Sequence, residues 1–406
     1  MHDEPAPLPP DFAFVEKLSS GSQSRLLRVQ AQAPEKPTDF ALIKLPGQFA
    51  RDWNNWATRD SEFSRWLEGD VVLPAIEMRQ HEDRLLPVFE NFAGALSLES
   101  LIRPQGLRLR SFLRLALRLC AALARVHKNE IIHNDLQPAS FLVNVRSGQI
   151  RITGFGRAQL ASVHEGGNPT RVWSSMRYLS PERSGRINRP VDFRSDYYSL
   201  TAILYELLCG VPPFDLEDPL ELLHAHIALR PRAPHEVRSD IPRVLSDILM
   251  RNLAKSPDDR YRSLSGLQAD LRECLRQLRE NDSVIDFAPG TFDATDRYFS
   301  PRRLYGREAE LAALSADFQR SAAGNVVLSL IDGHSGIGKS ALVHELSVAV
   351  FRQRGSFVEG KFDQLQRDPL PAAARAGAAP GRAECSPHAE PNGKPQSLLS
   401  GISGFH

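Results

Sequence analysis

The residues His133-Asn134-Asp135-Leu136-Gln137-Pro138 stand between a long helical pattern and two short apolar runs. Upstream, residues 108–128 place apolar side chains at helical spacing with arginines on the other side, which predicts a helix with one buried face. Downstream, the runs 141–145 and 149–153 are typical of strands. An aspartate on a loop held by such elements can accept a proton from a hydroxyl nucleophile. A loop aspartate on its own is more often a turn or capping residue, so the interpretation depends on the rest of the chain.

Strand patterns precede this loop, and helical patterns follow it. Residues 40–44 and 85–90 predict strands, and Phe63, Trp66 and Leu67 have the i, i+3, i+4 spacing of an amphipathic helix within residues 51–68. The later helical patterns cover residues 196–210, 219–229, 243–254 and 264–278. The order predicts an α+β unit with a β-rich first part and a helical second part.

A series of short motifs lies along the same residues in a fixed order. They are Ala41-Leu42-Ile43-Lys44, His133-Asn134-Asp135, Gly154-Phe155-Gly156, Ser180-Pro181-Glu182, Asp196-Tyr197-Tyr198-Ser199-Leu200 and a late arginine, Arg260. In this order, residues 11–280 resemble a eukaryotic-type serine/threonine protein kinase domain. The resemblance implies a two-lobed fold that binds ATP, with a β-rich amino-terminal lobe and a helical carboxy-terminal lobe.

The resemblance also implies a role for each matching residue. Asp135 would be the catalytic base, and Lys44 would hold the α- and β-phosphates with Glu62 as its carboxylate partner. Glu90 would begin the hinge that contacts adenine, and Gly21 would belong to the loop that covers the phosphates. The structural roles implied for the helical lobe are an ion pair of Glu182 with Arg260 and hydrogen bonds from the catalytic-loop backbone to Asp196.

The chain departs from the kinase pattern where the pattern supplies metal ligands. Gly154 replaces the metal-binding aspartate and Ser140 the metal-binding asparagine, while Gln137 replaces the catalytic-loop lysine. The phosphate-covering loop, Leu18 to Ser24, keeps one glycine. Kinase catalysis consists mostly of positioning and of charge neutralisation by Mg²⁺, and losing one such electrostatic element costs about 3–4 kcal/mol. We therefore expect a pseudokinase or a weakened kinase, with no metal site and doubtful use of Mg²⁺.

A second unit begins near Leu304. Gly333-His334-Ser335-Gly336-Ile337-Gly338-Lys339-Ser340 follows an apolar strand pattern at 326–332 and opens a helical pattern at 340–351. This is the context of a phosphate-binding loop: Gly333 and Gly338 allow close backbone approach, Lys339 contacts the phosphates, and the Ser340 hydroxyl binds Mg²⁺.

Two flanking motifs, Leu304-Tyr305-Gly306-Arg307-Glu308 and Gly360-Lys361-Phe362-Asp363-Gln364, resemble AAA/STAND-type ATPases. The combined order resembles bacterial multi-sensor signalling proteins, in which a kinase-like domain precedes an AAA-type ATPase, a GAF domain and a histidine kinase. We expect this likeness to end near Leu370, because no acidic-ended strand follows. The sequence therefore predicts an incomplete α/β unit that cannot hydrolyse ATP.

The expected boundaries follow from these patterns and from composition. We expect a disordered start at 1–10, the kinase-like domain at 11–280, a linker at 281–303, the partial ATPase unit at 304–370, and a tail at 371–406. The tail is rich in Ala, Gly, Pro and Ser, and it fits either disorder or an out-of-frame stretch of a truncated product.

Composition argues against several other functions. The chain has 406 residues and a formal net charge of +1, which argues against nucleic acid or a membrane surface as partner. Four widely spaced cysteines and an acidic, Pro-rich start suggest reduced thiols in a cytoplasmic protein. The open alternatives are an active serine/threonine kinase that uses ATP and Mg²⁺, a kinase-fold module that binds nucleotide or an unknown protein partner without transfer, and a truncated product.

Overall fold

The structure is a computed structural model of the whole chain. It describes residues 8–20, 24–32, 40–47, 52–67, 70–161, 176–187, 189–293 and 306–334, single helical or turn positions between 337 and 353, and the strands at 357–361 and 399–403. The chain divides into two compact units, the first made mostly of residues before 299 and the second mostly of residues after 298.

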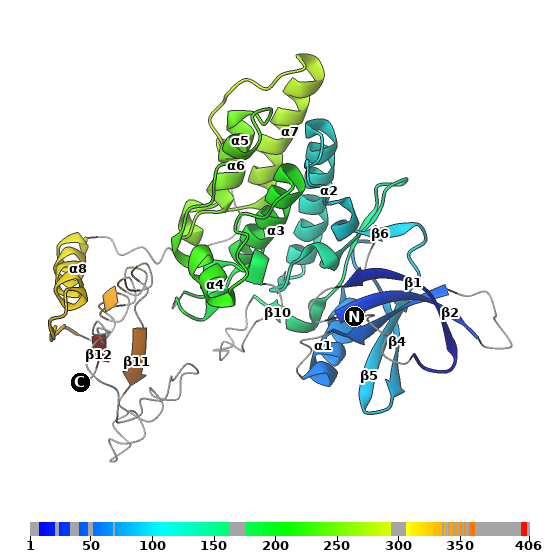
Figure 1. Ribbon diagram of the computed structural model, residues 1–406, viewed down its shortest axis with the longest axis horizontal. Coiled ribbons are helices and arrows are strands. Elements are labelled where there is room, and N and C mark those ends of the chain that lie inside the picture. The colour runs from blue at the N-terminus through cyan, green and yellow to red at the C-terminus, as the bar shows by residue number, and fades with distance from the viewer. Residues whose placement is uncertain are drawn as a thin grey trace. The chain divides into compact units, whose positions relative to one another are not determined.

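The amino-terminal lobe of the first unit is an antiparallel sheet with one helix beside it (Figure 1). In the described residues the strand order is β1-β2-β3-β5-β4, and helix α1 (Trp53–Trp66) enters between β3 and β4. The strands are β1 (Phe12–Ser20), β2 (Ser24–Ala31), β3 (Phe40–Pro46), β4 (Ala75–His81) and β5 (Arg84–Glu90). Because side chains alternate along a strand, β3 turns Ile43 and Leu45 toward the buried cluster that contains Trp53 and Trp56.

The carboxy-terminal lobe is mainly helical, and Figure 1 shows its helices gathered on the opposite side of the unit from the sheet. Its helices are α2 (Leu109–Lys128), α3 (Phe193–Cys209), α4 (Pro219–Ala228), α5 (Pro234–Val237), α6 (Arg243–Asn252) and α7 (Leu264–Glu280). Every residue of α3 is buried, so α3 forms the centre of the lobe. Gly210 ends α3 in a left-handed conformation with φ 81°, which suits glycine.

Short strands frame the loop that carries Asp135. Strand β6 (Ala95–Ser97) pairs with β8 (Phe141–Asn144), which pairs with β9 (Ile150–Ile152), while β7 (Ile131–Ile132) pairs with β10 (Gln159–Leu160). Six short 3-10 helices join the described elements of this unit: η1 (Leu98–Leu101), η2 (Pro138–Ser140), η3 (Phe155–Arg157), η4 (Met176–Tyr178), η5 (Pro181–Ser184) and η6 (Pro257–Asp259).

The residues that follow α7 are bound to the helical lobe. We call residues 282–293 the strap. The Asp286 carboxylate accepts a hydrogen bond from the Val244 amide at the start of α6 (3.2 Å), and the Asp293 carboxylate accepts from the Arg262 and Ser263 amides before α7 (2.9 and 3.1 Å). This stretch was expected to belong to a linker, but its carboxylates cap two helices and fix it in place.

The second unit is described in part. Helix α8 (Glu308–Ala322) packs Leu314 and Phe318 against Leu342, Leu346 and Val350. The expected strand at 326–332 is not formed, and its alternate side chains Val326, Leu328 and Leu330 are exposed. Strand β11 (Phe357–Lys361) pairs in parallel with β12 (Leu399–Ser403), which lies inside the expected disordered or out-of-frame tail.

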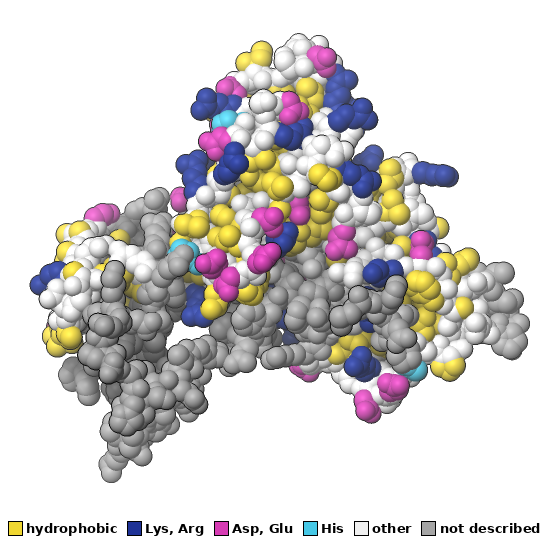
Figure 2. All heavy atoms as spheres, in the orientation of Figure 1, with side chains coloured by type: hydrophobic (Ala, Val, Ile, Leu, Met, Phe, Trp, Pro, Cys, Tyr) yellow, Lys and Arg dark blue, Asp and Glu magenta, His cyan; other side chains and the backbone are white. Residues whose placement is uncertain are grey.

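The surface carries both signs of charge. On the face that Figure 2 shows, basic and acidic side chains are interspersed over the described residues, in keeping with 50 basic and 49 acidic residues in the sequence. Among the described helices, none has the length and apolarity needed to cross a bilayer. The cysteines Cys120, Cys209 and Cys274 are buried and free.

Candidate functional site: a lysine, two aspartates and the segment at Gly154

Lys44 is a buried cation in the middle of the amino-terminal lobe. It lies on β3, between β2 and β5, and its side chain is 2% exposed. Its Nζ donates to the Asp60 carboxylate at 2.6 Å and to the Thr153 hydroxyl at 2.7 Å. The rings of Trp56 and Phe89 lie 5.2 and 4.9 Å from Nζ, close enough for cation–π contact. Burial lowers the pKa of Lys44, and the Asp60 and Asp135 carboxylates oppose that shift.

The partner of Lys44 is Asp60, which corrects the expectation of Glu62. Glu62 is exposed, whereas the Asp60 side chain is 0% exposed. The buried face of α1 consists of Trp53, Trp56, Ala57, Asp60, Ser61 and Ser64. The spacing of Phe63 and Trp66 predicted a different buried face for this helix, but Trp66 is 57% exposed. Trp53, Trp56 and Asp60 have the i, i+3, i+7 spacing of one helix face. That pattern could have identified Asp60 as a buried residue.

Asp60 also holds the segment that begins at Gly154. Its Oδ1 accepts hydrogen bonds from the amides of Gly154 (3.1 Å) and Phe155 (2.6 Å). A Cβ added at Gly156 would lie 2.3 Å from the Trp56 ring, so only glycine permits this close approach of α1. One turn along α1, Arg59 donates to the Ala158 carbonyl at 2.6 Å. Helix α1 is therefore joined to residues 154–158 by backbone and side-chain contacts.

The loop that carries Asp135 is fixed by Asp196, as the sequence predicts. The two carboxylate oxygens of Asp196 accept hydrogen bonds from the His133 amide (2.7 Å) and the Asn134 amide (3.0 Å). Although burial opposes it, the hydrogen bond from His127 helps to lower the pKa of Asp196. Asn134 has φ 65°, a left-handed conformation that asparagine tolerates better than most residues.

Asp135 itself is buried next to two other groups of the site. Its amide donates to His133 Nδ1 (3.2 Å), and its carboxylate oxygen Oδ2 lies 3.8 Å from Arg157 Nε. The His133 ring contacts the carbonyl of Thr153 (3.2 Å), and the hydroxyl of the same threonine binds Lys44. The structure therefore brings Lys44 and Asp135 together around Thr153, a residue that the sequence analysis did not single out.

The two positions that replace metal ligands offer no substitute ligand. Gly154 has no side chain, and the Ser140 hydroxyl contacts the Asp135 carbonyl (3.2 Å) and the Gln137 amide (3.3 Å) inside its own turn. Within the described ranges, no three His, Cys, Asp or Glu side chains gather as a metal site. The positions where the kinase pattern places its two metal ligands thus hold a glycine and a serine.

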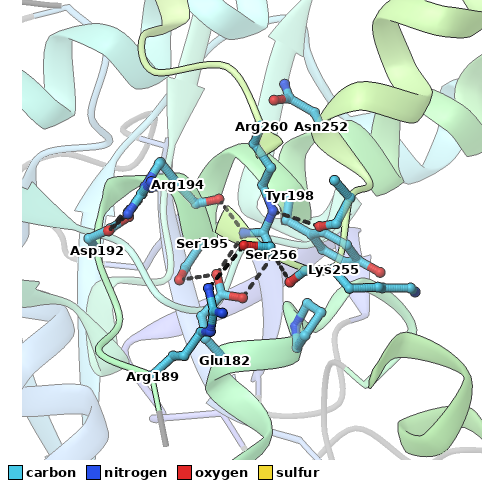
Figure 3. Close-up of polar contacts among 12 residues, drawn as sticks. Glu182, Arg189, Asp192, Arg194, Ser195, Tyr198, Asn252, Lys255, Ser256 and Arg260 are labelled. Atoms are coloured by element: carbon cyan, nitrogen blue, oxygen red, sulfur yellow. Dashed lines mark hydrogen bonds and ion pairs between the residues drawn. The ribbon is translucent and has the colours of Figure 1, made fainter. Parts of the chain in front are cut away.

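Glu182 and Arg260 form the ion pair that the sequence predicts (Figure 3). Two parallel hydrogen bonds of 2.7 and 2.9 Å join the guanidinium to the carboxylate, and Ser195 donates to the same carboxylate at 2.5 Å. Arg260 also donates to the backbone carbonyls of Arg194 and Ala254. Burial opposes ionisation, but the guanidinium lowers the pKa of Glu182. The pair ties η5 to α3 and to the residue after η6, which is a structural role.

The remaining predicted site residues lie elsewhere. Glu90 ends β5, is largely exposed and pairs with Arg151 at 3.0 Å. Gly21 lies outside the described residues, as do Gly338 and Ser340 in the second unit. Gly333 is described, and Lys339 donates its Nζ to the carbonyls of Gly333 and His334, so its ammonium contacts the loop's own backbone.

Comparison with known families divides the chain as the motifs do. The protein kinase domain family matches residues 12–271, and the AAA ATPase domain family matches residues 303–395. The second match runs past residue 370, where the likeness was expected to end. Both matches agree with the order of motifs in the sequence.

Two curated relatives each match about half of the chain. The hybrid signal transduction histidine kinase G of Dictyostelium discoideum is 34% identical over 219 residues, 49% of this chain and 6% of that protein. The serine/threonine-protein kinase PknB of Mycolicibacterium smegmatis is 31% identical over 242 residues, 57% of this chain and 38% of that protein. The chain thus spans well under half the length of these relatives.

A solved structure is also similar. The crystal structure of a mutant PknI kinase domain from Mycobacterium tuberculosis matches with a TM-score of 0.48 and 22% identity, covering 65% of this chain and 95% of that one.

Proposed function

The chain belongs to the protein kinase family through residues 12–271, and from this premise we propose that its kinase domain is a signalling module that binds ATP and transfers phosphate weakly or not at all. The ATPase domain that follows supports a regulatory setting, as does the likeness to a hybrid signal transduction histidine kinase.

One observation carries the proposal. The position that should supply a metal-binding carboxylate is Gly154, and the nearby Ser140 hydroxyl is used inside its own turn. Removing one preorganised electrostatic element from an active site costs about 3–4 kcal/mol, or about 10²–10³ in rate. With both ligands replaced, the reaction loses the charge neutralisation on which phosphoryl transfer depends.

The residues that remain support binding of the nucleotide. Lys44 keeps a buried ammonium with one N–H beyond those that bind Asp60 and Thr153. The Asp60 contacts hold α1 and the segment at Gly154 in one arrangement, so this part of the site is preorganised. A preorganised site binds more tightly because less ordering accompanies binding.

Calorimetric titration of the full chain with ATP tests the binding. The Lys339→Ala background removes the loop lysine of the second unit, and a further Lys44→Met change removes the proposed anchor. We expect binding that requires Lys44 and that Mg²⁺ does not strengthen. A Mg²⁺-dependent gain of about tenfold or more, ~1.4 kcal/mol, would contradict the loss of the metal site.

A radiolabel assay with γ-labelled ATP tests transfer. The full chain should label neither itself nor a generic protein substrate at a rate near the roughly 1–100 s⁻¹ usual for kinases. Asp135→Asn is the matched control, because any transfer by this site should disappear with the base.

The second candidate function is an active serine/threonine kinase that uses ATP and Mg²⁺. The proximity of Asp135 and Lys44 around Thr153 favours it, since a base and a phosphate anchor are both retained. Rapid labelling that Asp135→Asn abolishes would establish this function and exclude the first.

A further inference from the structure

Arg157 is a partly buried cation with an unused donor beside Asp135. It ends η3, and its side chain is 20% exposed. Its Nε is buried and, within the described part of the chain, has no hydrogen-bond acceptor. The nearest carboxylate oxygen, Asp135 Oδ2, is 3.8 Å away, which is too far for a hydrogen bond. A buried N–H without an acceptor is unfavourable, so an oxygen from a ligand would complete this arrangement.

Arg157 also belongs to the same short turn as Gly154. Gly154 caps η3, and Arg157 is its third residue after the cap. The guanidinium therefore belongs to the turn that begins where the kinase pattern places a metal-binding carboxylate.

Further cations accompany Arg157. Arg183, from η5, interacts electrostatically with both Asp135 and Arg157: burial lowers the pKa of Arg183, the Asp135 carboxylate opposes this shift, and the Arg157 charge adds to it. Lys44 reaches Thr153, the residue that precedes Gly154. The Lys44, Arg157 and Arg183 cations all interact with the Asp135 carboxylate.

We propose that Arg157 binds the terminal phosphates of the nucleotide in place of a metal ion, so that the site takes a nucleoside triphosphate free of divalent cation. This inference rests on the proposed nucleotide-binding function and specifies how that site neutralises phosphate charge. A guanidinium has five N–H donors in a fixed plane, so Arg157 can face Asp135 and a phosphate oxygen together.

The proposal makes metal-free ATP the better ligand. Mg²⁺ on the phosphates would place a second positive charge beside Arg157, and like charges in a partly buried site repel. Binding should therefore weaken when Mg²⁺ is added. A site in which Arg157 merely packs against Asp135 would show no such dependence.

The experiment is a calorimetric titration of the full-length Lys339→Ala protein with ATP in EDTA, with ATP and excess Mg²⁺, and with adenosine. Arg157→Ala should weaken metal-free ATP by about tenfold or more and leave adenosine unchanged, because adenosine has no phosphate. Arg157→Lys should retain part of the affinity, as it keeps the charge. Arg146→Ala, at an exposed turn between β8 and β9, is the matched control and should have no effect.

The outcomes separate the two proposals. If the parent binds ATP through Lys44 and Arg157→Ala binds it equally well in EDTA, the role of Arg157 is wrong and the nucleotide-binding function stands. If Mg²⁺ strengthens binding to the parent, the metal-free site is wrong. If the parent binds no ATP under either condition, both proposals fail. If Arg157→Ala does not fold, the same titrations are carried out with Arg157→Gln.

Discussion

At Gly154, the surrounding space would admit a side chain, but the backbone conformation disfavours one. A Cβ there would lie 3.6 Å from the Ser140 hydroxyl oxygen and 3.9 Å from a His133 ring carbon, both ordinary contacts. The φ of 96°, however, belongs to the left-handed region, where a residue with a side chain pays about 1–2 kcal/mol. Aspartate tolerates that region better than most residues, so the metal-binding aspartate of the kinase pattern can be introduced here.

Restoring both metal ligands should restore metal dependence. In Gly154→Asp with Ser140→Asn, we expect Mg²⁺ to strengthen ATP binding and labelling from γ-labelled ATP to rise. The two changes should be non-additive, because both side chains would hold one ion. Gly154→Ala is the control: it also places a side chain in the left-handed conformation, but without a carboxylate. A double variant that stays indifferent to Mg²⁺ would show that the metal ligands are not what this site lacks.

His226 makes the folded protein sensitive to acid. Burial lowers the pKa of His226 to about 3, with the nearby Lys255 charge adding to the shift. Its Nδ1 lies 2.9 Å from the Tyr198 hydroxyl. An unfolded histidine takes up a proton near pH 6.5, whereas the folded one stays neutral down to about pH 3. The unfolded state therefore binds more protons in this window, and stability falls as the pH drops through it.

Replacing His226 should flatten that dependence. His226→Phe loses the Tyr198 hydrogen bond, so its stability should be lower at neutral pH, by about 1 kcal/mol. Its loss of stability on acidification should be smaller than in the parent, by up to ~1.4 kcal/mol per pH unit. Urea midpoints at several pH values measure this. His235→Phe, which also removes a hydrogen-bonded histidine, should keep the parent's slope.

Carboxylate hydrogen bonds, rather than apolar contacts, hold the strap in place. Phe292 and Ile285 are exposed, at 75% and 65%. The Asp293 side chain is 2% exposed and accepts from two amides before α7. The strap therefore completes the amino-terminal ends of α6 and α7.

Removing the Asp293 carboxylate should destabilise the kinase domain. Asp293→Ala leaves the Arg262 and Ser263 amides without their acceptor, at a cost of about 1–2 kcal/mol, as for other lost caps. The control is Glu280→Ala, which removes an exposed ion pair with Arg276 outside the strap and should cost under about 1 kcal/mol. Chemical denaturation compares the two. Equal losses would mean that the strap does not stabilise α7.

Motif order predicted the fold because each motif residue makes one specific polar contact that joins segments far apart in the sequence. Asp196 holds the loop at His133, and Glu182 binds Arg260. Each of these residues can be recognised in its motif before the fold is known. The partner of Lys44 was mispredicted because the choice of face on α1 depends on packing against Gly156, far along the chain. Thr153 and Arg157 were missed because neither residue type carries a signal until the fold places it.

For the whole molecule, the two domains should bind ATP with opposite metal dependence. The kinase domain has Gly154 and Ser140 in place of the two metal ligands of the kinase pattern, whereas the sequence of the second unit has the lysine and serine of a phosphate-binding loop. In titrations with Mg²⁺, Lys339→Ala should remove the metal-dependent component. In EDTA, Lys44→Met should remove the remaining one. A single class of site that one substitution abolishes under both conditions would contradict this division.

The strap also determines which contacts of the kinase domain bear a tension applied along the chain. Residues beyond 293 lead to the ATPase domain, and tension along them first loads Asp293 and the start of α7. Helix α7 is bound to α2 through Gln268, which donates to the Leu117 carbonyl (3.2 Å). The end of α2 leads through β7 into the loop of His133 and Asp135. A displacement of the strap thus has a contiguous route through α7 and α2 to the loop that carries Asp135.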